Sequence, residues 1–320
     1  MTSSFESTAG IDNAALASEK SRRDWVIKVL RGNDANGEAV TNRLMEQLSD
    51  NPQILYRDRE TAIAITPEPL KPFVCTEQYH RDGITLRCSI GTKEMSPTMA
   101  SRLRSLYVSQ HPIRHLTPEY LGDFSRSAFM LLYRYSYIDP GFRRQGYLAP
   151  KYFDAIWDAF GRPVDLESFA AAFNTTAPSY CSLFPDVERP FGSRGSFFDL
   201  KSLEVEDQLV QVSPPRVGRI TMQAVEHSIR LLKDSSDVVV RYFVLLTPTA
   251  WPDIGEAIEK SGFLVWSNRT KRGDTIEYND VVKNEPTRFP MPRVSVMSNR
   301  SLPLDDRTSN VLHEAFSNTD

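Results

Sequence analysis

The chain has 320 residues, of which 40% are hydrophobic and 25% charged, as is typical of a globular protein with an apolar core. A net charge of −3 excludes a protein that holds nucleic acid by bulk positive charge, so such contacts would need a local basic patch. No apolar stretch reaches the ~20 residues that span a bilayer, and the amino-terminal segment has no hydrophobic signal region. The three cysteines form no CxxC pair, which favours a reducing compartment. We expect a soluble intracellular protein, nuclear or cytoplasmic.

The first half of the chain predicts a tail, a small module and a helical segment. Residues 1–20 are small and polar and are expected to be disordered. Residues 21–115 indicate an α+β module, because "GITLRCSIG" and an earlier run are rich in β-formers. Residues 116–162 indicate a helical companion segment, in which Thr117 is the expected N-cap of the first helix. Gly161 is the expected stop of the second helix.

From residue 163 to 300 strand and helix patterns alternate, which indicates an α/β fold with a doubly wound sheet. Helices are expected at 220–232 and 253–262, and residues 301–320 are expected to be a flexible tail. Ligands of such sheets bind at the carboxyl ends of strands. The predicted strands are 164–169, 195–200, 209–212, 238–246, 262–266 and 293–297.

The segment "SPPR", residues 213–216, follows one of these strands directly. Each proline fixes φ and removes an N–H donor, so the corner is stiff and presents acceptors only. A nucleobase amine is a poor nucleophile, and a site can help it by accepting both of its hydrogens while holding its nitrogen in line with an electrophilic methyl group. The Ser213 hydroxyl and the Pro214 carbonyl are the candidate acceptors. The alternative is that Pro214 and Pro215 merely end a strand.

The residues around this corner resemble the phosphorylated-CTD-interacting factor family of cap-specific adenosine N6-methyltransferases. "CSLFPD" at 181–186, "FGSRG" at 191–195 and "SPPR" at 213–216 occur in the family's order and at similar spacing. The upstream "FAAAFN" at 169–174 is similar to a further family segment, with Asn174 matching its last residue. The resemblance covers about residues 115–300.

The resemblance implies a class I, Rossmann-like methyltransferase domain that binds S-adenosyl-L-methionine. The catalytic residues that it implies are Ser213, Pro214, Pro215 and Arg216. Two alternatives stay open: Arg194 in a structural salt bridge, and Asp186 as a turn-forming residue. The implied cofactor-binding residues are Asn174, Asp186, Phe191, Gly192, Ser193, Arg194 and Gly195.

The corner departs from the family pattern at two positions. Ser213 replaces the family's Asn, and a hydroxyl has a shorter reach than an amide. Arg216 replaces an aromatic residue; a guanidinium plane can stack on a purine, but its charge opposes a sulfonium cofactor. An acid such as Glu204, Glu206 or Asp207 is a candidate to neutralise it. No tryptophan pair with WW spacing occurs before residue 110, so we expect no binding of the polymerase tail through a WW module.

RNA contacts are predicted in two basic loops, 142–147 and 268–274, with solvated surface charge as the alternative. Tyr147, Trp251 and Trp266 are candidates to stack on methylguanine. The five histidines show no ligand spacing, and we predict no metal. The predicted RNA-binding residues are Arg143, Arg144, Arg269, Lys271 and Arg272.

Three hypotheses follow. The first is an S-adenosylmethionine-dependent RNA adenosine N6-methyltransferase at or near the mRNA cap, with capped mRNA or other RNA and the transcription or capping machinery as partners, and no membrane. The second is a catalytically inactive RNA-binding or scaffold protein with the same fold. The third is methylation of another amine, such as cytosine N4 or a protein amide.

Overall fold

The computed structural model describes residues 75–81, 83–88, 91–111, 118–138, 146–215, 218–235, 239–249, 251–268, 274–281, 285–300 and 302–317. The chain divides into two compact units. Unit 1 holds residues 1–97 and 113–144, and unit 2 holds residues 98–112 and 145–320. The domain limits drawn from the sequence stay predictions, but the structure groups the first helix of the companion segment with the preceding strands.

The described residues of unit 1 form an antiparallel meander and one long helix. The meander is formed by β1 (Thr76–His80), β2 (Gly83–Cys88) and β3 (Gly91–Met95), in that order. The helix is α5 (Pro118–Ile138), and its buried face includes Phe124, Ala128 and Leu132, as its 3–4 spacing predicts. The Ser125 hydroxyl donates to Glu77 of β1 at 2.6 Å.

Unit 2 is built on a six-stranded sheet. Its strands lie in the order β6-β5-β7-β8-β12-β9. The first four are parallel to one another, and β12 is antiparallel to both of its neighbours. The strands are β5 (Leu166–Glu167), β6 (Ser179–Tyr180), β7 (Leu209–Val212), β8 (Tyr242–Thr247), β9 (Leu264–Ser267) and β12 (Arg293–Ser298).

The strand predicted at 195–200 is wrong. A 3-10 turn, η2 (Phe197–Asp199), takes its place, because the Ser196 side chain accepts a hydrogen bond from the Phe198 N–H and bends the chain. The extended backbone ends just before it, where Ser193 forms an isolated parallel bridge with Tyr180.

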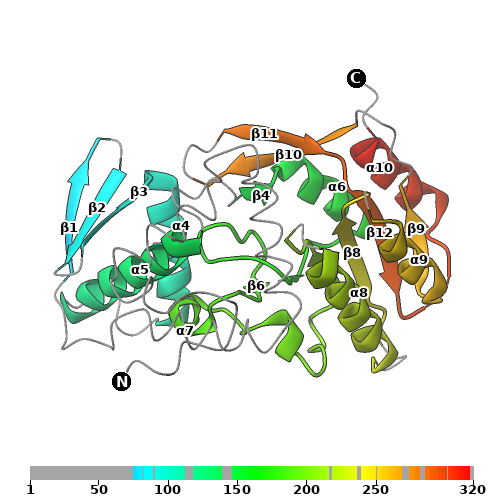
Figure 1. The fold of residues 1–320 in the computed structure, drawn as a ribbon, viewed down its shortest axis with the longest axis horizontal. Helices are drawn as coiled ribbons and strands as arrows, with labels where there is room; N and C mark the ends of the chain where they lie inside the picture. Colours follow the sequence, from blue (N-terminus) through cyan, green and yellow to red (C-terminus); the bar gives the residue numbers. More distant parts are fainter. Residues whose placement is uncertain are drawn as a thin grey trace, which may run out of the picture. The chain divides into compact units, whose positions relative to one another are not determined.

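Helices cover both faces of the sheet (Figure 1). On one face, α6 (Pro150–Phe160) and α10 (Asp306–Phe316) pack on Val244 and Val296. On the other, α8 (Gly218–Lys233) and α9 (Pro252–Lys260) pack on Phe243 and Leu245. Successive residues of β8 therefore face opposite cores, as the period of two along a strand requires. This explains the nearly continuous apolar run of β8.

The flexible tail predicted for residues 301–320 is wrong over α10. Asp305 caps this helix by accepting a hydrogen bond from the Thr308 N–H at 2.8 Å. Leu312 and Phe316 are fully buried, and the Phe316 ring stacks on Tyr152 of α6 with centroids 5.2 Å apart. Because this short helix begins with polar residues, the spacing of its apolar residues was not recognised from the sequence.

A second, three-stranded antiparallel sheet in unit 2 was not expected from the sequence. It has the order β11-β10-β4, with β4 (Gly146–Leu148), β10 (Thr275–Asp280) and β11 (Pro286–Pro290). Lys151 of α6 and Arg288 of β11 both pair with Glu277 of β10. In the described part of the chain, no helix is both long and apolar enough to cross a membrane.

Candidate active site

The carboxyl ends of β5 and β7 lie side by side at the point where the strand order reverses. The chain leaves β5 for β6 on one side and returns to β7 on the other. Glu167 is paired with Gln211, and the Ser168 N–H donates to the Gln211 carbonyl at 2.9 Å. Open α/β sheets bind their ligands in the crevice at such a switch point. The diproline corner therefore follows β7 where this architecture places a site.

The corner itself is held by α8. Ser213 is half-buried, Pro214 is buried and Pro215 is exposed. The Thr221 hydroxyl donates to the Pro215 carbonyl at 3.2 Å and ties the corner to the first turn of α8. Between described residues, no hydrogen bond uses the Ser213 hydroxyl or the Pro214 carbonyl. Within the described part of the protein, neither acceptor is therefore engaged by another protein group. Arg216 lies outside the described residues.

Two buried hydroxyls at the same edge of the sheet have no partner among the described residues. They belong to Ser168, just after β5, and Thr247, the last residue of β8, and each residue is 1% exposed. A buried polar group without a hydrogen bond in a native structure calls for an explanation, such as a water or a ligand. The two strands that carry them flank β7.

The loop after β5 is braced by two buried carboxylates that the sequence analysis did not single out. Glu167 accepts hydrogen bonds from the N–H groups of Thr176 and Ala177 at 3.0 and 3.2 Å. Burial raises the pKa of Glu167 although these hydrogen bonds oppose it. Glu188, fully buried, accepts from the Ala172 N–H at 2.9 Å and the Tyr180 hydroxyl at 3.0 Å. The signal in the sequence that could have pointed to Glu167 was the presence of an acidic residue inside the strand predicted at 164–169.

Asn174 shapes this loop through both ends of its amide. Its Oδ1 accepts from the Ala171 N–H at 2.6 Å, and its Nδ2 donates to the Gly146 carbonyl at 3.2 Å. Next to it, Arg102 of α4 (Pro97–Gln110) donates to the Phe173 carbonyl at 3.0 Å and lies over the Tyr147 ring, 4.7 Å from its centroid. The side chain predicted to bind a cofactor thus has protein partners at both its oxygen and its nitrogen.

The turn at 191–195 packs against α4 and the end of β6. Phe191 is fully buried, 5.7 Å from the Tyr107 ring, so it is a core residue. Gly192 has φ +93°, and a Cβ there would lie 2.7 Å from the Gln110 side chain. The Ser193 hydroxyl lies 2.6 Å from that of Ser182. Gly195, at φ +100°, has open space where a side chain would project.

Arg194 makes a salt bridge at the other end of β7. Its Nη1 lies 2.8 and 2.7 Å from the two carboxylate oxygens of Asp207, and its Nη2 lies 3.3 Å from Glu204. Asp207 comes two residues before β7, whereas Ser213 follows the carboxyl end of that strand. These contacts support the alternative interpretation of Arg194, in which it forms a structural salt bridge and does not bind the cofactor. They also occupy two of the three acids suggested as counter-ions for Arg216.

Comparison with known proteins decides the family. A family model described as "Phosphorylated CTD interacting factor 1 WW domain" matches residues 102–279, more than half of the chain. The chain belongs to this family. It is 36% identical over 93 residues to the human mRNA (2′-O-methyladenosine-N(6)-)-methyltransferase and 33% identical over 93 residues to the mouse protein of the same name. Each alignment covers 29% of this chain but only 12% of the relative.

The family match contains the whole candidate site. It includes the loop after β5, the 191–195 turn, the corner and the β8–α9 connection, and it ends before β12. The expectation that the polymerase tail is not bound through a WW module stays a prediction.

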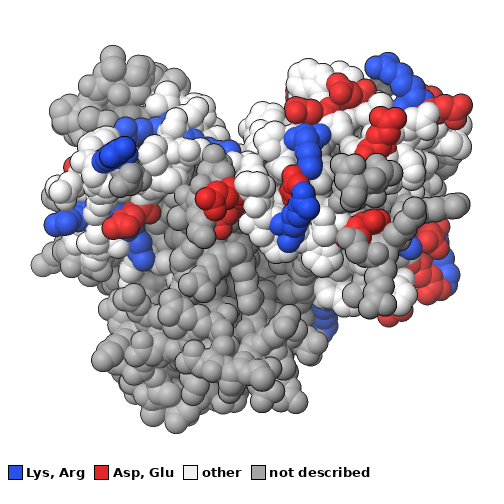
Figure 2. Space-filling view, turned by 90° about the horizontal axis from the view of Figure 1, so that it is seen from above, with Lys and Arg blue, Asp and Glu red and all other residues white. Residues whose placement is uncertain are grey.

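The remaining predicted site residues of this family member are Asp186 and the five basic residues of the two predicted RNA-binding loops. Asp186 is exposed in the first turn of the short helix α7 (Pro185–Glu188). The predicted RNA-binding residues lie outside the described residues: Arg143, Arg144, Arg269, Lys271 and Arg272. On the face drawn in Figure 2, basic and acidic side chains of the described residues are interspersed.

Proposed function

We propose that this chain is an S-adenosylmethionine-dependent RNA adenosine N6-methyltransferase that acts at or near the mRNA cap. The observation that carries the proposal is the position of the diproline corner. It follows β7 at the switch point, with the Ser213 hydroxyl and the Pro214 carbonyl not bonded to any described residue. The names of the human and mouse relatives support the reaction and the substrate. Parallel strands covered by helices on both faces support a class I, Rossmann-like methyltransferase domain.

The chemical work of the corner is to orient an amine. The lone pair of an adenine N6 amine is delocalised into the ring, so the amine reacts only when its nitrogen is held in line with the methyl group. The Ser213 hydroxyl and the Pro214 carbonyl accept its two hydrogens. The Thr221 hydroxyl keeps the neighbouring Pro215 carbonyl in place, so the acceptors are already aligned before RNA binds.

The donors and acceptors at this edge fit a nucleoside cofactor that carries an amino acid. The fit rests on Ser168, whose buried hydroxyl has no partner in the described part of the chain. We propose that Ser168 holds a polar group of S-adenosylmethionine and that Asp186, Ser193 and Gly195 line the same site. Asn174, Phe191, Gly192 and Arg194 then act by shaping the loops. When bound, the cofactor supplies an electrophilic methyl group.

A second candidate function is a non-catalytic RNA-binding protein with the same fold. The observation that favours it is the pairing of Arg194 with Asp207 and Glu204, because these acids are then engaged and do not serve Arg216. An uncompensated arginine beside a sulfonium weakens cofactor binding. Arg216→Phe separates the two candidates: activity that appears or rises in the variant identifies the arginine as the defect.

The test of the proposal is methyl transfer by the full chain. Capped RNA that begins with 2′-O-methyladenosine is incubated with radiolabelled S-adenosylmethionine, and capped RNA that begins with 2′-O-methylguanosine is the control. We expect label at adenine N6 and none in the control. Absence of transfer, together with no binding of S-adenosylhomocysteine in calorimetry and retained RNA affinity, overturns the proposal in favour of the second candidate.

A further inference from the structure

We propose that Trp251 is the base-stacking residue of this site and takes the place of the aromatic side chain that the corner lacks. The inference rests on the proposed function and deepens it, because it names the surface that holds the adenine ring. Position 216, where the resemblance leads us to expect an aromatic residue, is an arginine. A base that is presented to a corner of acceptors still needs a flat apolar surface beside it.

The topology brings Trp251 to the edge that carries the corner. β8 is paired with β7 in parallel, with Val212 opposite Leu245. The residues that follow the two strands therefore leave the sheet at the same edge. Trp251 comes four residues after the end of β8 and directly before α9. The corner comes directly after β7.

The indole ring lies against the start of α8. A Cβ built on Gly218, the first residue of α8, would be 3.6 Å from Cε2 and 3.7 Å from Cδ2 of Trp251. These atoms form the fused bond at the centre of the indole, so the ring itself is in contact with this position. Gly218 is three residues after Pro215, and the Thr221 hydroxyl one turn later holds the Pro215 carbonyl. The residue that the ring contacts is thus three positions from the corner in the sequence.

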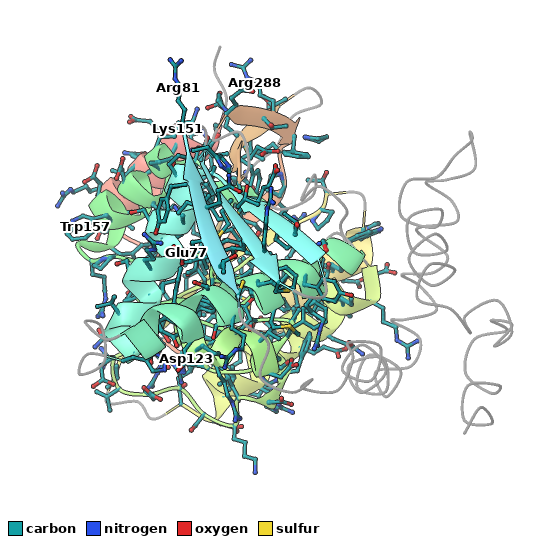
Figure 3. The ribbon with its side chains drawn as sticks, turned by 90° about the vertical axis from the view of Figure 1, so that its left-hand side faces the viewer. Glu77, Arg81, Asp123, Lys151, Trp157 and Arg288 are labelled. Carbon is teal, nitrogen blue, oxygen red and sulfur yellow. The ribbon has the colours of Figure 1, made fainter. Side chains whose placement is uncertain are left out.

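The exposure of Trp251 suits a binding surface. It is half-buried and packs against the apolar cluster between the sheet and α8 and α9. Part of the ring is anchored by this cluster, which keeps the ordering cost low when a ligand stacks on the remainder. The other two described tryptophans lie elsewhere: Trp266 is in β9 at the far edge of the sheet, and Trp157 is an exposed residue of α6 (Figure 3).

The experiment measures binding of two RNAs by the full chain and its variants. One RNA is short, capped and begins with 2′-O-methyladenosine, and the other lacks only the first adenine base. We expect Trp251→Ala to raise the Kd of the adenine RNA roughly tenfold or more and to leave the Kd of the abasic RNA unchanged. Trp251→Phe keeps the discrimination within about threefold of the wild type, because a phenyl ring still stacks. Trp157→Ala is the matched control and is expected to change neither Kd.

A second readout does not depend on the alanine variant folding. Adenine that stacks on an indole quenches its fluorescence, so the adenine RNA is expected to quench the wild type more than the abasic RNA does. Trp251→Phe should abolish this difference. The proposal is overturned if the wild type does not discriminate between the two RNAs, if both Trp251 variants bind the adenine RNA like the wild type, or if they lose both RNAs equally. Wild-type methyl transfer is scored separately, so failure of catalysis and failure of stacking give different results.

Discussion

The Thr221 hydroxyl donates a hydrogen bond to the Pro215 carbonyl at 3.2 Å and joins the first turn of α8 to the diproline corner. Thr221 is fully buried, whereas Pro215 is exposed. This bond fixes the Pro215 carbonyl, which directly follows the two proposed acceptors, and the fixed φ of Pro214 and Pro215 limits the freedom of the backbone between them.

Thr221→Val removes this bond without creating a cavity, because the two side chains have similar volumes. We expect methyl transfer to fall several-fold while the free energy of unfolding falls by only about 1 kcal/mol, since water can reach the released carbonyl. The measurements are single-turnover kinetics and urea unfolding. Ser228→Ala on the same helix is the control, because it removes a buried hydroxyl bond to the Ala224 carbonyl away from the corner. Equal activity losses in both variants would contradict the assignment.

Ser213→Ala removes one of the two acceptors proposed for the amine. We expect kcat to fall about ten- to a hundredfold, as for other preorganised polar groups of active sites, with RNA affinity little changed. Ser213→Asn should recover activity, since an amide oxygen accepts the same hydrogen bond with a longer reach. Ser235→Ala, two residues after the end of α8, is the control. An unchanged kcat in Ser213→Ala argues against the proposed role of this hydroxyl.

His227 of α8 makes the stability of unit 2 sensitive to acid. Burial, together with the nearby Arg230, lowers the pKa of His227 from 6.5 to about 4. The unfolded chain therefore binds more protons than the folded chain between these values, so the free energy of unfolding decreases as the pH falls through this window. The loss between pH 7.5 and pH 4 is at most about 3 kcal/mol. The Phe197 ring, 4.7 Å away, makes an aromatic replacement compatible with the site.

The expected result is that His227→Phe flattens this part of the pH profile of urea unfolding. The quantity to compare is the difference between wild type and variant at each pH, because carboxyl groups contribute equally to both. His313→Gln on the exposed side of α10 is the matched control. A difference that does not change between pH 7 and pH 4 refutes the assignment.

Phe316→Ala tests whether the carboxyl-terminal helix belongs to the core. Phe316 is fully buried and stacks on Tyr152, so truncation leaves a cavity and should lower the free energy of unfolding by about 3–5 kcal/mol. Leu302→Ala is the control, since Leu302 is 71% exposed. A change of less than 1 kcal/mol in Phe316→Ala would favour a loosely attached tail.

Disulfide formation between Cys75 and Cys88 tests the register of β1 and β2. Thr76 is paired with Arg87, so Cys75, one residue earlier, lies opposite Cys88, one residue later. Burial, with the neighbouring Cys88, raises the pKa of the Cys75 thiol to about 12. Diamide, which takes up the two thiol hydrogens, should therefore join Cys75 and Cys88 within one chain, slowly at pH 7 and faster at pH 9. Peptide mapping checks the bond, and cross-links only between chains would contradict the register.

Several local elements of this protein can be predicted from its sequence alone. β7 has the predicted bounds, and α8 extends the predicted helix by two residues at its start and one at its end. The reason is that apolar periodicity, prolines and glycines act over a few residues. The same local signals predicted a site after β7, because the diproline ends the strand directly. The comparison that shows the family confirms the resemblance carried by "FGSRG" and its neighbours.

Only the tertiary structure decided which distant residues meet. The strand order places Ser168 beside the corner. The fold also brings Trp251 to Gly218, although α8 and β8 separate the two in the sequence. The tertiary structure also places Arg194 in a salt bridge with Asp207 rather than in a position that would bind a ligand. These contacts join residues that are 13 to more than 30 positions apart in the sequence, so no local pattern encodes them. They follow from burying the two apolar faces of one sheet at the same time, which is a property of the whole unit.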